Sequence, residues 1–95
     1  MKLIKQSKQF RKDYKKLKKS WNKDIKKLNN ILWQIIDWEK LEFKHKNHKL
    51  KWKWENCYDC HIEWDWVLVY EKYINEDWNK IIIFHTTDNH SNLFW

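Results

Sequence analysis

The fold is decided by the stretch Cys57-Tyr58-Asp59-Cys60-His61-Ile62-Glu63-Trp64-Asp65-Trp66-Val67-Leu68-Val69-Tyr70. Apolar and polar residues alternate over 58–63, and a run of β-branched and aromatic residues begins at Trp66, which together are typical of two antiparallel strands joined by a tight turn. We therefore predict strands over 57–63 and 66–73, with residues 63–65 as the turn. Residues 50–54 are expected to belong to the first strand as an interrupted extension of it.

Toward the C-terminus, the apolar run 81–84 (Ile-Ile-Ile-Phe) predicts a third strand over 79–86. Residues 75–79 (Asn-Glu-Asp-Trp-Asn) have the composition of a hairpin loop. Residues 90–95 are expected to form a short final turn of helix or coil. The sequence thus predicts a small antiparallel sheet of three main strands.

Toward the N-terminus, residues 2–6 are compatible with a short strand, and two helices follow. Ser7 is a suitable cap for a helix over 8–19, where apolar residues recur at helical spacing. Asn22 is the expected cap of a second helix over 23–37, and the two helices should form a hairpin. Helices packed on a small antiparallel sheet make this an α+β protein. The apolar positions of the two helices are Phe10, Tyr14, Leu17, Ile25, Leu28, Leu32, Ile35 and Ile36.

A chain of 95 residues fits one domain, which we expect to span 1–95. It contains no run of about 18 apolar residues, so no transmembrane helix is expected. The first residues lead straight into charged ones, which argues against a secretory signal and favours the cytoplasm. Residues 39–49 are polar and irregular, and we see no internal repeat.

The net charge of +7 is unevenly distributed. Residues 1–30 carry +10, residues 31–60 carry +1 and residues 61–95 carry −4. Such asymmetry is typical of a basic face that meets a polyanion, most commonly a nucleic acid. A solvated lysine-rich helix pair without a partner explains the charge equally well at this stage.

The sequence contains no Gly, no Pro and no Ala, but nine Trp. A designed or composition-restricted sequence has this character, and AT-rich coding explains part of it. Turns that require positive φ must then use Asn or Asp, or place a bulky residue such as Trp in a strained conformation.

Cys57-Tyr58-Asp59-Cys60-His61 matches the C-x-x-C-H pattern of covalent haem attachment. On a strand, however, positions 57 and 60 point to opposite faces, so one haem or one zinc ion cannot use both sulfurs. A redox C-x-x-C prefers a helix N-terminus, which we do not expect here. Two half-buried cysteines in a reducing cytoplasm are the simplest interpretation, and we expect no metal and no cofactor.

Acidic residues and histidines cluster around the first predicted strand. Asp59, His61 and Glu63 share one face by the two-residue period, and Asp65 follows in the turn. An antiparallel sheet can bring this strand close to His90 after the last strand. Imidazoles exchange protons near neutral pH, so the group is suited to acid–base chemistry. Without further information, surface polar groups are the commoner explanation.

Four stretches, in order along nearly the whole chain, resemble the YafQ branch of the RelE toxin superfamily. Residues 48–54 (His-Lys-Leu-Lys-Trp-Lys-Trp) are similar to its H-x-L-x-G-x-W motif, and residues 59–70 to D/E-x-H-I/V-x-P-D-W-x-L-I/V-Y. Residues 7–13 match S-x-x-F-x-K/R-D, and residues 90–94 resemble the T-H-x-x-L-F ending. Each motif is weak alone, but together they are fairly specific.

The resemblance implies the RelE-like fold and a ribosome-dependent mRNA endonuclease that a cognate antitoxin neutralises. Cleavage of RNA without metal needs a base for the ribose 2′-OH, an acid for the leaving 5′-oxygen and positive donors for the phosphate. The family's functional positions fall on His48, Asp59, His61, Asp65, His90 and Phe94.

We assign His61 and His90 as the acid–base pair, in an order that stays open. Asp59 and Asp65 would orient the imidazoles and tune their pKa values by charge. Lys53 or His48 would neutralise the phosphate. Phe94 would stack on an unpaired base, unless it simply packs the tail against the core. The residues expected to bind RNA phosphates are Lys12, Lys15, Lys16, Lys19, Lys51 and Lys53.

Departures from the family pattern affect the site. Trp52 and Trp64 replace its Gly and Pro, and Asp88 replaces the Gly of R-T-G-T-H. Thr86 replaces the Arg of that motif, and Tyr58 stands where Arg is frequent. Two phosphate-binding cations are therefore missing. The alternative to an active nuclease is a weak or inactive protein of the same fold that only binds antitoxin or RNA.

Overall fold

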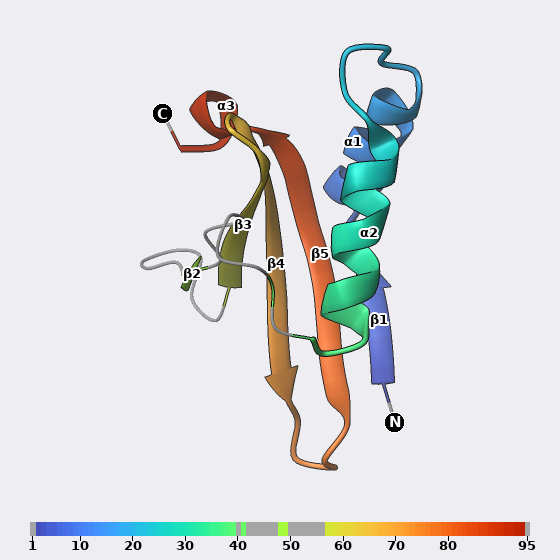
Figure 1. Ribbon diagram of the computed structural model, residues 1–95. Helices are drawn as coiled ribbons and strands as arrows, with labels where there is room; N and C mark the ends of the chain where they lie inside the picture. Colours follow the sequence, from blue (N-terminus) through green and yellow to red (C-terminus); the bar gives the residue numbers. More distant parts are fainter. Residues whose placement is uncertain (1, 40, 42–47, 50–56, 95) are drawn as a thin grey trace.

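The computed structural model describes residues 2–39, 41, 48–49 and 57–94. These residues form one sheet, with the two longer helices together on one of its faces (Figure 1). The predicted extension over 50–54 lies outside the described residues. The elements are β1 (Lys2–Gln6), α1 (Lys8–Lys18), α2 (Ile25–Ile36), β2 (His48–Lys49), β3 (Cys57–Glu63), β4 (Trp66–Ile74), β5 (Lys80–Asn89) and α3 (His90–Phe94).

The sheet has the strand order β1-β5-β4-β3-β2. The pairs β2–β3, β3–β4 and β4–β5 are antiparallel, and the turn at 64–65 lies where the sequence predicts it. The difference is at the edge, where β1 runs parallel to β5 with Leu3 opposite Ile81. The pairing of β1 with a strand more than 70 residues later produces no pattern in the local sequence, so the periodicity of apolar residues did not predict it.

The caps of the helices were predicted correctly for α1 and wrongly for α2. The Ser7 hydroxyl oxygen accepts the backbone N–H of Phe10 at 2.9 Å. Helix α2 is capped by Asp24, whose carboxylate accepts the N–H of Lys26 at 3.0 Å. Asn22 does not cap this helix, because its amide oxygen accepts a hydrogen bond from the Ser20 hydroxyl in the turn.

The core lies between the sheet and the helix pair. Trp66, Leu68 and Tyr70 project from β4 into this layer, and each is at most 1% exposed. The indole Nε1–H of Trp66 donates to the Thr87 hydroxyl at 2.9 Å, so the ring is buried with its polar group satisfied. No helix among the described residues is long and apolar enough to cross a bilayer. The other main core side chains are Phe10, Leu17, Leu28, Ile31, Ile35, Leu41, Cys60, Ile62, Ile82 and Phe84.

Two tryptophans occupy positions where glycine is usual. Trp38 has φ 63° and Trp78 has φ 65°, the only positive values among the described residues. Trp38 follows the cap of α2: its N–H donates to Ile35 O, and Glu39 N–H donates to Gln34 O, which is the Schellman pattern. Of the alternatives expected for positive φ in a Gly-free chain, Asn or Asp on one side and a strained Trp on the other, the described residues use Trp at both positions.

Candidate functional site

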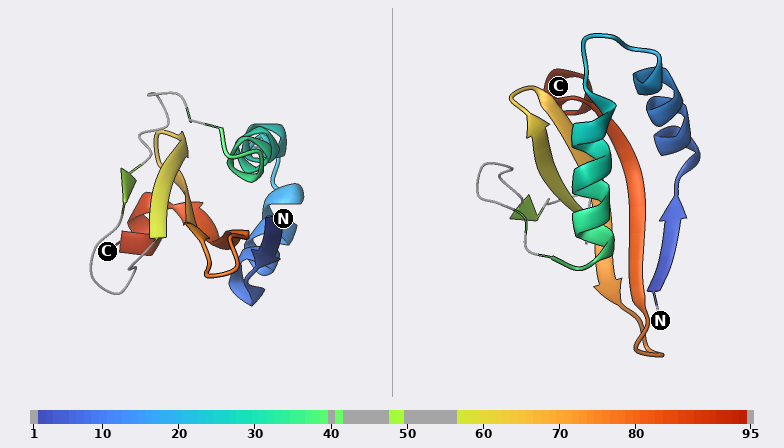
Figure 2. Two further views of the ribbon diagram at one scale, coloured as in Figure 1. Left: turned by 90° about the horizontal axis from the view of Figure 1, so that it is seen from below. Right: turned by 45° about the vertical axis from the view of Figure 1, so that its right-hand side comes forward.

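Strand β3 divides its side chains between the two faces of the sheet. Tyr58, Cys60 and Ile62 join the layer packed against the helices. Cys57, Asp59 and His61 alternate with them and therefore project from the opposite face. Asp59 is 1% exposed there. Seen end-on, α3 lies on the other side of the sheet from α2 (Figure 2, left).

The structure brings together His61 of β3 and His90, the first residue of α3. Their ring centroids are 5.9 Å apart and the ring planes are inclined by 28°, so the imidazoles are stacked. The backbone N–H of His90 donates to Asp65 O at 2.8 Å, which ties the start of α3 to the β3–β4 turn. Strand β3 and helix α3, which the β4–β5 hairpin separates in the chain, thus come together at this histidine pair.

The hydrogen bond of His61 indicates the tautomer of its neutral form. Its Nδ1 lies 3.2 Å from the carbonyl oxygen of Trp64. Because a carbonyl can only accept, the proton of this hydrogen bond is on Nδ1. A neutral His61 then carries its lone pair on Nε2, the nitrogen that can exchange a proton with a substrate.

The other four predicted site residues are placed less completely. His48 lies in β2, directly opposite Asp59 in the register, and Phe94 lies in α3; their side chains are outside the described part of the structure. Asp65 is exposed in the turn, and the contact that it makes to His90 uses its backbone carbonyl rather than its carboxylate. Asp59 shares the face of His61.

The predicted RNA-binding lysines fall into two groups. Lys51 and Lys53 lie outside the described residues. The four on α1 and at its C-cap, Lys12, Lys15, Lys16 and Lys19, are exposed.

Lys23, which sequence reasoning did not select, contacts Asn89, the residue that precedes His90 in the chain. Its Nζ donates to Asn89 Oδ1 at 2.6 Å and lies 5.6 Å from the centre of the Trp66 ring. Lys16 and Lys23 both line a cavity of about 250 Å³ beside the end of β5, next to His90 in the chain. No local pattern distinguishes Lys23 from its lysine neighbours.

Thr86, at the position of the family's Arg, and Tyr58, at a position where Arg is frequent, are used differently here. Tyr58 stacks on Tyr70 with ring centroids 5.5 Å apart, on the face that packs against the helices. Thr86 is 5% exposed and donates its hydroxyl to Asp13 Oδ2 at 2.6 Å. The same carboxylate oxygen accepts the Thr87 N–H at 3.2 Å, so these contacts fasten α1 to β5.

The two cysteines are free thiols on opposite faces of the sheet, as the strand period predicts. Burial is the main reason that the pKa of Cys57 is raised from 9.0 to about 11, with a smaller effect from the charge of Glu71. Burial also raises the pKa of Cys60, which is in the core. A haem or metal held by both sulfurs is incompatible with this arrangement.

A sequence model described as the bacterial toxin of type II toxin–antitoxin systems, YafQ, matches residues 2–95. The chain belongs to this family. Nearly its whole length is covered, which confirms the resemblance noted in the sequence and the RelE-like α+β fold. No curated protein matches the chain by sequence.

Solved structures agree with the family. The chain is 31% identical to YafQ of E. coli strain BL21(DE3), with a TM-score of 0.85 and all of both chains covered. It is 32% identical to the toxin in the E. coli DinJ–YafQ complex, with a TM-score of 0.84 and the same coverage. The YoeB–YefM toxin–antitoxin complex of Staphylococcus aureus gives 28% identity and a TM-score of 0.70, over 95% of this chain and 98% of that one.

Proposed function

We propose that this chain is a cytoplasmic endoribonuclease that cleaves mRNA on the ribosome and so inhibits translation. In this proposal it needs no metal for the reaction, and the ribose 2′-OH is the nucleophile. The observation that carries the proposal is the stacked pair His61–His90, whose ring centroids are 5.9 Å apart. Two imidazoles close enough to serve one phosphodiester, one as a base and one as an acid, are what this reaction needs.

In the proposed reaction, one imidazole takes the proton of the 2′-OH while that oxygen attacks the adjacent phosphorus. The other imidazole gives a proton to the departing 5′-oxygen, so a cyclic phosphate forms and the chain is cut. Nε2 of His61 is suited to either task, because Nδ1 is engaged with the Trp64 carbonyl. Asp59 would favour a charged imidazole nearby by its own negative charge.

The remaining assignments concern binding of the RNA. His48 or Lys53 would neutralise the phosphate, Asp65 would help to orient an imidazole, and Phe94 would stack on an unpaired base. The exposed lysines of α1 would bind ribosomal RNA, together with Lys23 of the α1–α2 turn; Lys16 and Lys23 line the cavity beside the end of β5. Because counterions are released when lysines meet phosphates, binding to ribosomes should weaken steeply as salt is raised.

We also propose a cognate antitoxin as the second partner. The E. coli relative is known in complex with DinJ, and the chain matches that toxin over its whole length. A positively charged N-terminal half suits a partner whose contact surface is acidic.

The test is cleavage of an mRNA on programmed ribosomes, read by mapping transcript ends. The enzyme is treated with EDTA and desalted before it meets the ribosomes, which themselves need Mg²⁺. His61→Ala and His90→Ala should each lower the cleavage rate by about 10²–10⁴-fold, the usual contribution of general acid–base catalysis. The matched control is His85→Ala, a half-buried histidine outside the pair, which should cleave like the wild type.

A second candidate function, docking on antitoxin or ribosome without cleavage, is favoured by one observation. Neither Tyr58 nor Thr86 supplies the positive charge that the family's arginines carry, and Thr86 is held by Asp13. Losing one donor to the transition state costs about 3–4 kcal/mol in comparable sites. If the wild type co-sediments with ribosomes but cleaves no faster than the His61→Ala/His90→Ala double variant, this second function replaces the first.

A further inference from the structure

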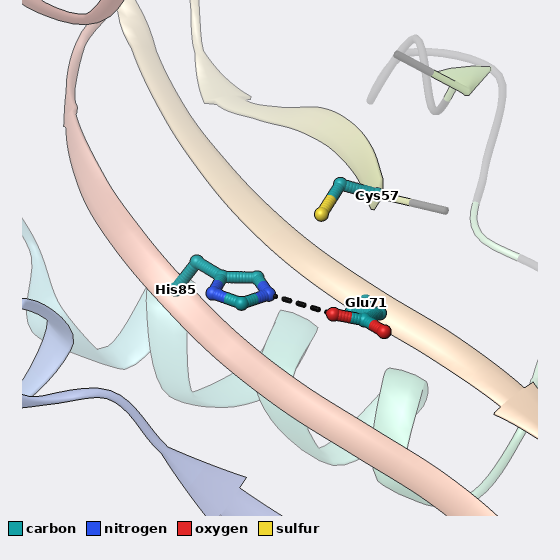
Figure 3. Close-up of side chains that lie close together, drawn as sticks. All are labelled: Cys57, Glu71 and His85. Carbon is teal, nitrogen blue, oxygen red and sulfur yellow. Dashed lines mark hydrogen bonds and ion pairs between the residues drawn. The ribbon is translucent and has the colours of Figure 1, made fainter. Parts of the chain in front are cut away.

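Three side chains from three neighbouring strands converge on the face of the sheet that carries Asp59. They are Cys57 of β3, Glu71 of β4 and His85 of β5 (Figure 3). One sulfur, one carboxylate oxygen and one ring nitrogen lie within 4.8 Å of one another. The family motifs do not include these positions, and the proposed cleavage reaction does not use them.

The register of the sheet explains this convergence. Cys57 and Glu71 are directly opposite partners in the β3–β4 pair, so their side chains leave the same face side by side. On β5 the pairing is irregular: Val69 faces Thr86 and Tyr70 faces Phe84, which leaves His85 as an extra residue. Such a bulge re-aims a side chain. Here it places His85 Nε2 3.0 Å from Glu71 Oε1, as the dashed line shows (Figure 3).

We propose that Cys57, Glu71 and His85 form a binding site for Zn²⁺, with the fourth position open to water. The donor set is the evidence, because zinc binds cysteine sulfur, histidine nitrogen and carboxylate oxygen in tetrahedral sites with three protein ligands. Ca²⁺ and Mg²⁺ are excluded by their requirement for oxygen ligands. A thiolate and a carboxylate together also balance the charge of a divalent ion.

The site needs only a small adjustment to close around the ion. Ligand atoms around tetrahedral zinc are about 3.5 Å apart, given metal–ligand bonds of about 2.0–2.3 Å. Side-chain rotations that move the ligand atoms by roughly 1 Å are therefore sufficient to bring all three within bonding distance of one ion. On binding, the Cys57 thiol releases its proton to solvent as the sulfur–zinc bond forms. The Nε2 proton that His85 donates to Glu71 moves to Nδ1 of the same ring or, from a doubly protonated ring, to solvent, and each residue then forms one bond to the metal.

The site is separate from the histidine pair. Cys57 and His61 lie four residues apart on the same strand, which corresponds to about 13 Å along β3. Cys57 is 5% exposed, and the side chains of Glu71 and His85 are 21% and 28% exposed, so the ion would be partly shielded but reachable from solvent. Zinc here would join three strands, and it should therefore stabilise the sheet.

The experiment uses the purified chain, reduced, treated with EDTA and desalted, and then titrated with Co²⁺ as a coloured substitute for zinc. We expect one equivalent of tetrahedral Co²⁺ with a thiolate-to-cobalt charge-transfer band that one equivalent of Zn²⁺ removes. The melting temperature should rise on addition of Zn²⁺. Cys57→Ser and His85→Gln should abolish the band and weaken zinc binding by about 100-fold or more, beyond the usual effect of a lost supporting group.

Two matched variants make the result specific. Cys60→Ala removes the other thiol, which is in the core on the opposite face, and should keep the band. The double variant His61→Ala/His90→Ala should also keep it, which separates this site from metal held by the histidine pair. If Cys57→Ser does not fold, as judged by circular dichroism, His85→Gln decides the question.

The proposal is overturned if Co²⁺ binds without a thiolate band, if the band survives in the His85→Gln variant, or if it disappears in the His61→Ala/His90→Ala variant. None of these outcomes depends on cleavage of RNA. The zinc site and the endonuclease can therefore be rejected independently.

Discussion

Replacement of Trp78 by Gly should make the protein more stable, although it deletes the largest kind of side chain. Trp78 has φ 65° in the β4–β5 loop and is 83% exposed, so little packing is lost. The left-handed conformation lowers the stability of the folded state by about 1–2 kcal/mol for a residue with a Cβ atom. Gly has no Cβ atom and avoids this cost. The greater freedom of Gly in the unfolded chain opposes this by about 0.5–1 kcal/mol.

The expected net stabilisation is therefore about 0.5–1 kcal/mol, which corresponds to a rise of about 2–8 °C in melting temperature for a domain of this size. Thermal and urea unfolding followed by circular dichroism measure both quantities, and the control is Trp21→Gly. Trp21 is 97% exposed in the α1–α2 turn, and its φ is not positive. In that variant Gly increases the conformational freedom of the unfolded chain, but no left-handed residue is relieved. It should therefore be less stable than the wild type by about 0.5–1 kcal/mol.

The difference in stability between Trp78→Gly and Trp21→Gly is a stricter test than either value alone, because both variants exchange an exposed Trp for Gly. Their stabilities should differ by about 1–2 kcal/mol, the cost of the left-handed conformation itself. Equal changes in the two variants would refute the reasoning. Trp38→Gly should gain less than Trp78→Gly, because Trp38 packs against the core and lies under the ammonium groups of Lys72 and Lys80.

Two further predictions concern polar groups in and around the sheet. Asp13→Ala should lower the free energy of unfolding in urea by about 2–4 kcal/mol, because it leaves the Thr86 hydroxyl and the Thr87 N–H without their charged acceptor. Asp13→Asn, which keeps an acceptor oxygen, should lose less; an equal loss in both variants would contradict this account. The buried thiols should make stability depend on pH. Since the pKa values of Cys57 and Cys60 are raised in the folded state, their contribution is present below the ordinary thiol pKa of 9.0 and is lost as pH rises toward 11. Urea unfolding between pH 7 and 11, with EDTA present, should show this decline, and a Cys57→Ser/Cys60→Ala variant should show less of it.

Local patterns predicted most of the elements, because the apolar residues of α1 and α2 recur at helical spacing and β4 and β5 contain continuous apolar runs. Element ends were less accurate: β5 continues to Asn89, since its last residues pair with β4 as far as Trp66. The second helix begins two residues later than expected, because Ser20 engages Asn22 and leaves Asp24 to cap it. These outcomes depend on partners that a periodic pattern does not contain.

The same distinction applies to the site. The order of the motifs and the two-residue period of the strand can both be read from the sequence. They were sufficient to expect His61 near His90, which the structure places together. The cluster of Cys57, Glu71 and His85 was not predicted, because it depends on a bulge that shifts β5 by one residue. Cys60 is near Cys57 along β3, whereas the residues that Cys57 meets in the cluster, Glu71 and His85, lie across the sheet on β4 and β5.

The parallel pairing of β1 with β5 has a consequence for how the protein is made. Leu3 must wait for Ile81 before the sheet can close, and His61 must wait for His90. At about 5–20 residues per second, roughly 4–18 s of translation separate the first strand from these partners. Throughout that interval a nascent toxin holds neither its finished sheet nor its paired imidazoles. If the proposed function is correct, the ribosome that synthesises the chain therefore meets no paired imidazoles until nearly all of its residues have been translated.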